Sequence, residues 1–194
     1  MKIAILGSPF DPPHLGHQLI SQQVLDFTDI DQVWLAPCYQ HAFNKSLTMV
    51  NHRVAMTKML INNKIKYCGE EIENQLSGAT IEFMTLLKQK FSQHHLSFII
   101  GSDNLKIFKK WHQWEKLLKT TRFLVFPRPG FDYNLKKYGL DSFEYQWELI
   151  RHSLLVNINI SSTNIRERVK KGFSISGIVP KEIENYIRKH KLYL

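Results

Sequence analysis

Cysteine is scarce in this sequence of 194 residues, and long apolar segments are absent. The two cysteines, Cys38 and Cys68, form no Cys-x-x-Cys pair, so reduced thiols are favoured over a disulfide framework. No apolar run approaches the roughly 20 residues that span a bilayer, and prolines follow Gly7 too early for a secretory signal peptide. We therefore expect a cytoplasmic protein that has no membrane partner.

Acidic residues are outnumbered by basic ones. The sequence has 17 Asp and Glu residues against 26 Lys and Arg residues, which gives a net charge of +9. This charge favours binding to nucleic acids, anionic membranes and small phosphorylated molecules alike, so it does not identify a ligand. The length suits one domain over residues 1–194, and no internal repeat or low-complexity segment divides the chain.

Apolar segments with the periods of strands and helices alternate along the chain. The predicted strands are Lys2–Leu6, Val33–Ala36, Leu96–Ile100, Arg122–Phe126 and Leu154–Ile158. The predicted helices are His14–Phe27, Arg53–Ile61, Thr80–Phe91 and Pro180–Lys191. The strands are continuous apolar runs, which is typical of parallel strands covered by helices on both faces. The sequence therefore predicts an α/β fold with a doubly wound parallel sheet.

Two segments near the last predicted strand have less regular patterns. Phe131–Tyr145 is polar and aromatic without a clear period, and we interpret it as a surface excursion. After the strand, Ser161–Asn164 offers several candidate helix N-caps, and Asn164–Glu167 has the spacing of a capping box. Gly172 then stands where a C-terminal helix cap is expected.

The segment after the first predicted strand carries the clearest chemical signal. In doubly wound sheets, ligands bind at the carboxyl ends of the strands, which is where Gly7–His17 is expected. This segment matches neither the GxGxxG fingerprint nor a Walker A loop. His14 and His17 stand at a helix start, where free N–H groups and the helix dipole favour an anion such as a triphosphate. An exposed helix start and a metal site shared with a cysteine remain alternatives, although HxxH lacks zincin spacing.

Several motifs, taken together, resemble a known family. The first is similar to the GxFDPxHxGH signature of the nicotinate mononucleotide adenylyltransferases, in the HxGH nucleotidyltransferase superfamily, through Gly7, Phe10, Asp11, Pro12, His14, Gly16 and His17. Four later segments also resemble parts of the family's sequence. Ile160–Arg166 resembles its ISSTxxR motif, and Gly101–Trp111 resembles its acceptor-side segment. Arg128–Gly130 resembles its RPG loop, and Leu192–Tyr193 resembles its terminal LY. The resemblance covers almost the whole chain.

The resemblance implies a Rossmann-like nucleotidyltransferase fold and a specific reaction. The adenylyl group of ATP would pass to nicotinic acid mononucleotide, with release of pyrophosphate and formation of deamido-NAD in NAD biosynthesis. The implied partners are ATP and a pyridine mononucleotide, with Mg²⁺ accompanying ATP and no metal held by the protein alone. No nucleic acid partner is expected, and a homo-oligomer is left open. Because the attacking phosphate is already ionised, positioning and charge neutralisation would replace a strong general base.

The resemblance also implies which residues act. Catalytic roles would fall to His14, His17, Lys45 and Arg166. ATP would be bound by Gly7, Ser8, Phe10, Gly16, Ser161, Ser162 and Thr163. The acceptor would be bound by Thr80, Asp103, Trp111 and Arg128. Taken singly, Trp111 also fits a packing pair with Trp114, and Asp103 fits a helix cap.

The sequence departs from the family pattern at a few positions. Ser8 and Pro9 replace the usual Gly and Thr, Ala79 replaces an aromatic residue before the threonine, and no Pro-Pro-His precedes Lys45. These departures keep nicotinamide mononucleotide or another phosphorylated small molecule open as the acceptor. An alternative of a different class, an inactive nucleotide-binding or RNA-binding module of the same fold, draws its support from the net positive charge.

Overall fold

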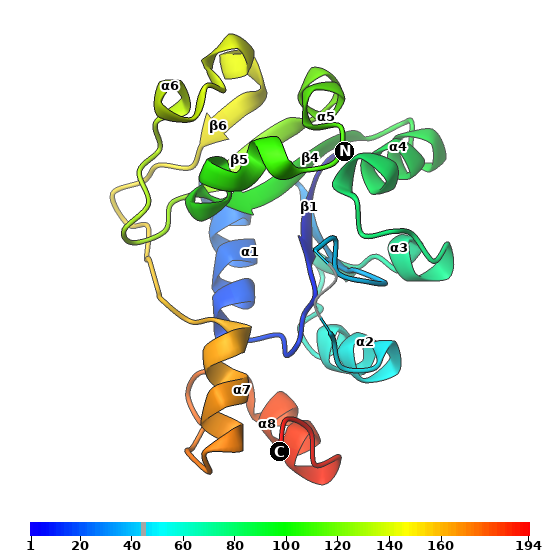
Figure 1. Ribbon diagram of the computed structural model, residues 1–194, viewed down its shortest axis with the longest axis vertical. Coiled ribbons are helices and arrows are strands. Elements are labelled where there is room, and N and C mark those ends of the chain that lie inside the picture. The colour runs from blue at the N-terminus through cyan, green and yellow to red at the C-terminus, as the bar shows by residue number, and fades with distance from the viewer. Residues whose placement is uncertain (44–45) are drawn as a thin grey trace.

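Six parallel strands form one sheet in the computed structural model, which describes residues 1–43 and 46–194 (Figure 1). The spatial order is β3-β2-β1-β4-β5-β6. The strands are β1 (Lys2–Ser8), β2 (Gln32–Pro37), β3 (Ile65–Tyr67), β4 (His95–Gly101), β5 (Arg122–Phe126) and β6 (Trp147–Leu149). The chain moves outward from β1 to β3 and then returns to β4, so the strand order reverses between β1 and β4. The predicted doubly wound parallel sheet is confirmed.

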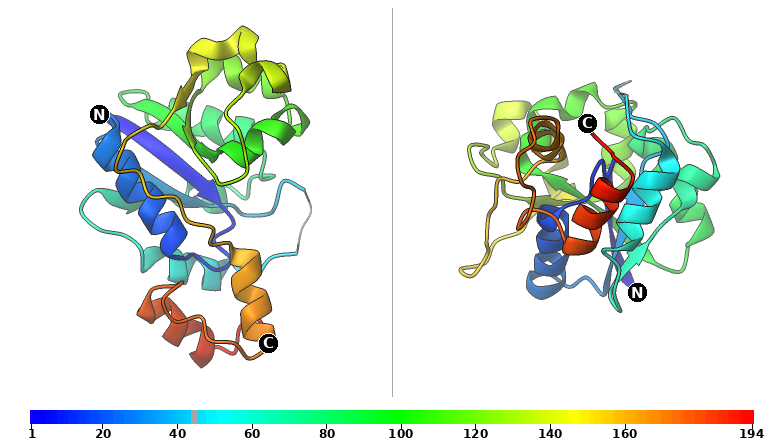
Figure 2. Two further views of the ribbon diagram at one scale, coloured as in Figure 1. Left: turned by 90° about the vertical axis from the view of Figure 1, so that its left-hand side faces the viewer. Right: turned by 90° about the horizontal axis from the view of Figure 1, so that it is seen from below.

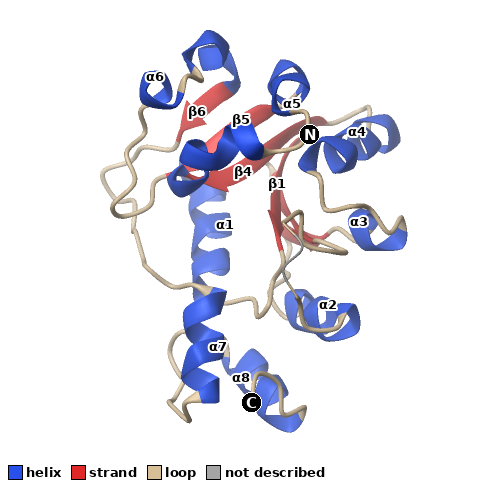
Figure 3. Cartoon of the chain, viewed as in Figure 1, coloured by secondary structure: helices blue, strands red, loops and turns tan. Residues whose placement is uncertain are grey.

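Helices cover both faces of this sheet (Figure 3). The longer ones are α1 (Leu15–Phe27), α2 (Val50–Lys58), α4 (Thr80–Lys90), α5 (Trp114–Thr120), α7 (Ser162–Lys170) and α8 (Lys181–Lys189). The shorter ones are α3 (Glu70–Glu73), α6 (Leu135–Tyr138) and two 3₁₀ helices, η1 (Ser102–Lys110) and η2 (Asp141–Gln146). The two last helices, α7 and α8, lie beyond the carboxyl end of β1 (Figures 1 and 2). Among the described helices, none is long and apolar enough to cross a membrane.

Each face of the sheet has its own apolar core, because neighbouring side chains along a strand point to opposite faces. One core joins the strands to α4 and α5 through Ile3, Ile5, Phe98, Ile100, Phe83, Leu87 and Leu117. The other joins them to α1 and α8 through Ala4, Leu6, Ile99, Leu124, Val24, Ile183 and Ile187. Burial on both faces explains why the strands read as continuous apolar runs in the sequence.

The prediction of a strand at Leu154–Ile158 is wrong, because this segment has no strand structure. The Leu154 and Val156 side chains are 72% and 51% exposed, so their apolar character does not reflect burial in a sheet. The backbone of Val156 is instead held by α1, where the Gln23 side-chain amide donates to the Val156 carbonyl at 3.0 Å. The sheet ends earlier in the chain, at β6, which pairs with β5.

Other predicted boundaries also differ from the structure. The helix expected at Arg53–Ile61 begins and ends three residues earlier, as α2, and the short strand β3 was not predicted. The excursion Phe131–Tyr145 contains α6 and most of η2. The capping box expected at Asn164–Glu167 is wrong, because the N-cap is Ser161, whose hydroxyl accepts a hydrogen bond from the Asn164 N–H at 3.2 Å.

Candidate active site

A cavity of about 720 Å³ opens where the strand order reverses, at the carboxyl ends of β1 and β4. Its lining includes the predicted residues Gly7, Ser8, His17, Thr80, Trp111 and Arg128. A second cavity, of about 130 Å³, is lined by His14, Gly16, Ser161 and Ser162 and shares His17 and Arg128 with the first. The larger cavity has the size of a small-molecule site, at the position where open α/β sheets bind ligands.

The two histidines meet at the start of α1, as the sequence predicted. His14 is the N-cap residue, and its backbone N–H donates to Nδ1 of His17 at 3.2 Å. The centres of the two imidazole rings are 3.8 Å apart. Both side chains are buried, and they flank the start of α1, whose dipole favours an anion. The N–H groups of Leu15 and His17 in this first turn already donate to the carbonyls of Ile178 and His14, at 3.1 and 2.9 Å.

Burial keeps both imidazoles neutral. It lowers the pKa of His14 to about 3, with a smaller contribution from the positive charge of Arg128. Burial also lowers the pKa of His17 well below its ordinary value, with further contributions from His14 and Arg128. Because Nδ1 of neutral His17 accepts a hydrogen bond, its proton lies on Nε2, which is 3.3 Å from the Ser8 hydroxyl oxygen. His17 therefore presents a single N–H donor toward the loop that lines the cavity.

Two neighbours shape the histidine pair. A Cβ atom on Gly16 would lie 2.8 Å from Nδ1 of His14, so only glycine leaves room for this ring position. The ring of Phe10 is fully buried and lies 4.7 Å from the ring of His17. Phe10, predicted to bind ATP, is outside the lining of both cavities, so the structure places it as a packing support for His17.

Asp11 links the loop after β1 to the C-terminal part of the chain. Its carboxylate accepts hydrogen bonds from the Tyr193 hydroxyl at 2.8 Å and from the Thr48 N–H at 3.1 Å. Its carbonyl accepts one from the guanidinium of Arg166 at 2.6 Å, and the Ser162 hydroxyl donates to the next carbonyl, that of Pro12, at 2.8 Å. Arg166 and the start of α7 are thus bound to the histidine loop, although Arg166 and Thr163 line neither cavity.

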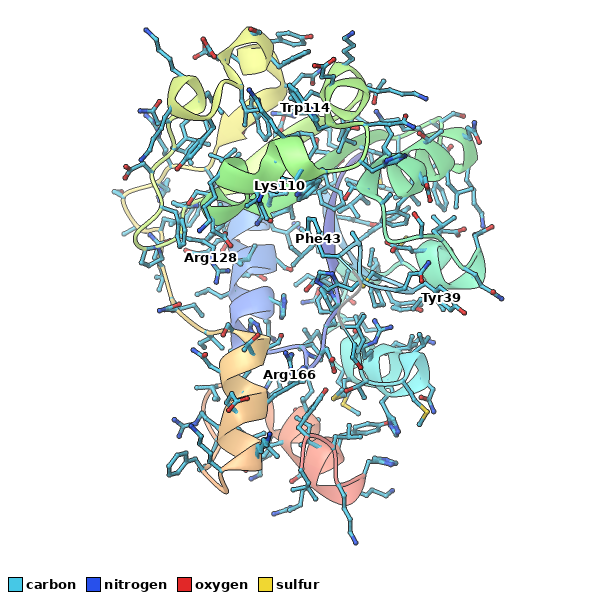
Figure 4. The ribbon with its side chains drawn as sticks, in the orientation of Figure 1. Tyr39, Phe43, Lys110, Trp114, Arg128 and Arg166 are labelled. Carbon is cyan, nitrogen blue, oxygen red and sulfur yellow. The ribbon has the colours of Figure 1, made fainter. Side chains whose placement is uncertain are left out.

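Three of the predicted acceptor residues, Asp103, Trp111 and Arg128, lie at or next to η1. Asp103 is in the first turn of η1 and forms an ion pair with Arg128 at 3.5 Å, without lining the cavity itself. Trp111 follows η1 and stacks on Phe108, with ring centres 4.9 Å apart. Figure 4 shows Arg128 near η1 and Arg166 on α7. Thr80, at the start of α4, also lines the larger cavity.

Two buried charged residues at the site were not predicted. The guanidinium of Arg53 is almost fully buried and donates to four backbone carbonyls at 2.7 to 3.0 Å, those of Pro9, Cys38, Tyr39 and Thr48. Glu71 lines the larger cavity, and burial raises its pKa to about 8. Nothing in a single sequence marks a charged residue as buried, because its environment is formed by segments far apart in the chain.

Lys45, predicted to be catalytic, lies outside the described residues. Within residues 1–43 and 46–194, no group of three or more His, Cys, Asp or Glu side chains is arranged to hold a metal ion. Cys38 and Cys68 are both free, and burial raises the pKa of their thiols to about 11 and about 12.

The sheet, its reversal point and the histidine pair at a helix start define a nucleotide-binding α/β protein. A family model described as cytidylyltransferase-like matches residues 5–168. Among curated relatives, the nicotinate-nucleotide adenylyltransferase of Bacillus subtilis is 33% identical, over 99% of this chain and 98% of its own length. The probable nicotinate-nucleotide adenylyltransferase of Halalkalibacterium halodurans is 36% identical, over 99% of this chain and 91% of its own length.

A solved structure agrees with these sequence matches. The nicotinic acid mononucleotide adenylyltransferase of Plasmodium falciparum, complexed with NaAD, superimposes with a TM-score of 0.82. It is 25% identical to this chain, and the match covers 99% of this chain and 97% of that one. The chain belongs to the nicotinate-nucleotide adenylyltransferase family, within the cytidylyltransferase-like proteins.

Proposed function

We propose that this chain transfers the adenylyl group of ATP to nicotinic acid mononucleotide, forming deamido-NAD and releasing pyrophosphate. The observation that carries the proposal is the buried pair of His14 and His17 at the start of α1, beside a cavity of about 720 Å³ at the reversal point of the sheet. In a chain of this family, that arrangement would provide a phosphate-binding site next to space for a second nucleotide.

In the proposed reaction, an oxygen of the acceptor's 5′-phosphate attacks the α-phosphorus of ATP. The bond from that phosphorus to the bridging oxygen breaks, and pyrophosphate leaves with the electron pair. Nε2–H of His17 would donate a hydrogen bond to the phosphate oxygens, where charge accumulates, and the dipole of α1 would favour the same negative charge. His14 would donate in the same way, and Lys45 and Arg166 would neutralise the leaving pyrophosphate.

The neutral state of the histidines suits this role. An imidazole that stays uncharged in the free protein avoids a buried cation before ATP arrives, and the phosphates then favour its protonated form. Mg²⁺ would enter as part of the MgATP substrate, held by phosphate oxygens and water, because the described residues offer no cluster of acidic ligands. The single-domain organisation over residues 1–194, the cytoplasmic location and a homo-oligomeric state remain predictions.

The acceptor would bind between Thr80, at the start of α4, and Trp111, after η1. Both residues line the cavity, and a half-buried tryptophan ring suits a flat pyridine. Arg128 would bind the acceptor phosphate, with Asp103 as the carboxylate that holds its guanidinium. The ATP side would be completed by Gly7, Ser8, Gly16, Ser161 and Ser162, with Phe10 and Thr163 behind them.

The direct test measures pyrophosphate release from MgATP with nicotinic acid mononucleotide and, separately, with nicotinamide mononucleotide. We expect release to favour the acid, and His17→Ala to reduce kcat on the order of 100-fold or more by removing one transition-state donor. His95→Ala is the matched control, because His95 is exposed at the amino end of β4, away from the cavity. Release with neither acceptor, or full activity in His17→Ala, would contradict the proposal.

A further inference from the structure

The three lysines of η1 have different surroundings. The ammonium of Lys106 lies 4.6 Å from the ring centre of Phe131, and that of Lys109 lies 5.4 Å from the ring centre of Trp114. Lys110 has no such contact and no ion pair in the described part of the chain, and it lines the larger cavity next to Trp111. The position of Lys110 on η1 is marked in Figure 4. Of these three lysines, only Lys110 therefore faces the proposed acceptor.

None of the other charged groups around the cavity forms an ion pair with Lys110 in the described part of the chain. Arg128 is already paired with a carboxylate, and His17 is neutral because of its burial. Of the acidic residues that line the cavity, Glu82 accepts a hydrogen bond at its carboxylate from the Ser77 hydroxyl at 2.6 Å. Burial raises the pKa of Glu71 and so disfavours its ionised form. The two remaining lining histidines are His41 and His112.

We propose that Lys110 sets the preference of this site for the acid over the amide form of the acceptor. The inference rests on the proposed function. Nicotinic acid mononucleotide and nicotinamide mononucleotide have nearly the same shape and share the 5′-phosphate, and they differ by the negative charge of one ring substituent. Shape contacts with Trp111 and phosphate contacts with Arg128 therefore affect both acceptors alike. A cation beside the stacking residue lowers the free energy of binding for the carboxylate and does little for the carboxamide.

The experiment compares kcat/KM for the two acceptors in the wild type, Lys110→Met and Lys109→Met. Methionine keeps a long apolar side chain while removing the charge, and Lys109 is the control because it lies in the same helix over Trp114. For Lys110→Met we expect the acid-to-amide ratio to fall by about three- to fivefold, the upper part of the range for one solvent-exposed ion pair. For Lys109→Met we expect a change smaller than about twofold. Where the amide is not turned over, its inhibition constant against the acid replaces kcat/KM.

Ionic strength provides an independent measurement. Raising it from about 0.01 M to about 1 M shortens the screening length from roughly 30 Å to roughly 3 Å. The acid-to-amide ratio of the wild type should fall over this range, and the ratio of Lys110→Met should stay nearly constant. An unchanged ratio in Lys110→Met, with both acceptors transferred, would overturn this inference and leave the proposed function intact. Transfer to neither acceptor by the wild type would overturn both.

Discussion

Glu71→Gln should gain stability relative to the wild type as the pH rises from about 5 to 8. The Glu71 side chain is 5% exposed, and one of its carboxylate oxygens has no hydrogen-bond partner among the described residues. The nearby guanidinium of Arg53 does not form an ion pair with it, because four of its N–H groups donate to backbone carbonyls. Burial therefore dominates and raises the pKa of Glu71 to about 8, although the Tyr39 N–H and Arg53 oppose this shift.

The direction of the pH dependence follows from proton binding. In the unfolded chain Glu71 loses its proton near its ordinary pKa of 4.5, whereas in the folded protein it keeps the proton until about pH 8. The folded state binds the additional proton in this window, so the unfolding free energy falls as the pH rises through it. At about 1.4 kcal/mol per pH unit, the difference between wild type and Glu71→Gln should grow by about 3 kcal/mol from pH 5 to pH 8.

Urea denaturation of the wild type, Glu71→Gln and Glu167→Gln at pH 5, 6, 7 and 8 provides the measurement. Glu167 is an exposed residue of α7, so Glu167→Gln controls for the loss of a surface carboxylate. The quantity of interest is how the stability difference changes with pH, because the new amide adds a pH-independent desolvation cost of its own. Parallel pH profiles for wild type and Glu71→Gln would refute the reasoning, since the carboxyl would then be solvated in the folded state.

Two further predictions concern the substrate site. Burial lowers the pKa of His14 from 6.5 to about 3, so the wild type should lose stability as the pH falls below 6.5. In urea denaturation at pH 4.5, the unfolding free energy of the wild type should have fallen by about 2 to 3 kcal/mol relative to that of His14→Gln. A difference that does not depend on pH would mean that His14 is protonated in the folded state. In steady-state kinetics, Trp111→Ala should raise KM for the acceptor far more than KM for ATP, because the ring lines the cavity on the acceptor side. Equal increases of the two KM values would contradict the stacking role of Trp111.

The parts of the fold that could be predicted from sequence are those that local pattern determines. The first strand, the loop after it and the start of α1 follow from one apolar run, two prolines and a helical stripe. The capping residue Ser161 was among the predicted candidates for the same reason. By contrast, Leu154–Ile158 has strand composition but no strand structure, because β6 already occupies the sheet edge and Gln23 binds the backbone of Val156.

The candidate site likewise contains residues that a local sequence pattern predicts and residues that it does not. The histidine pair was predictable because its spacing and the helix start belong to one short segment, and glycine is required at position 16 to leave room for the His14 ring. Arg53 and Glu71 were not predictable, since each is buried only where the loops after β1 and β2 come together. A charged residue on a helix reads as solvent-exposed until the packing of distant segments is known.

Few of the basic side chains that give the protein its net positive charge lie at the candidate site. Of the 26 Lys and Arg residues, the described part of the chain places Lys110 and Arg128 in the lining of the two cavities. Arg128 is paired with Asp103, and the two histidines are neutral. Phosphate binding would therefore depend on a few placed groups, namely the imidazole N–H donors of His14 and His17, the dipole of α1 and Arg128, more than on the net charge. An RNA-binding module needs clustered Lys and Arg side chains instead, so the geometry of this site favours small phosphorylated substrates.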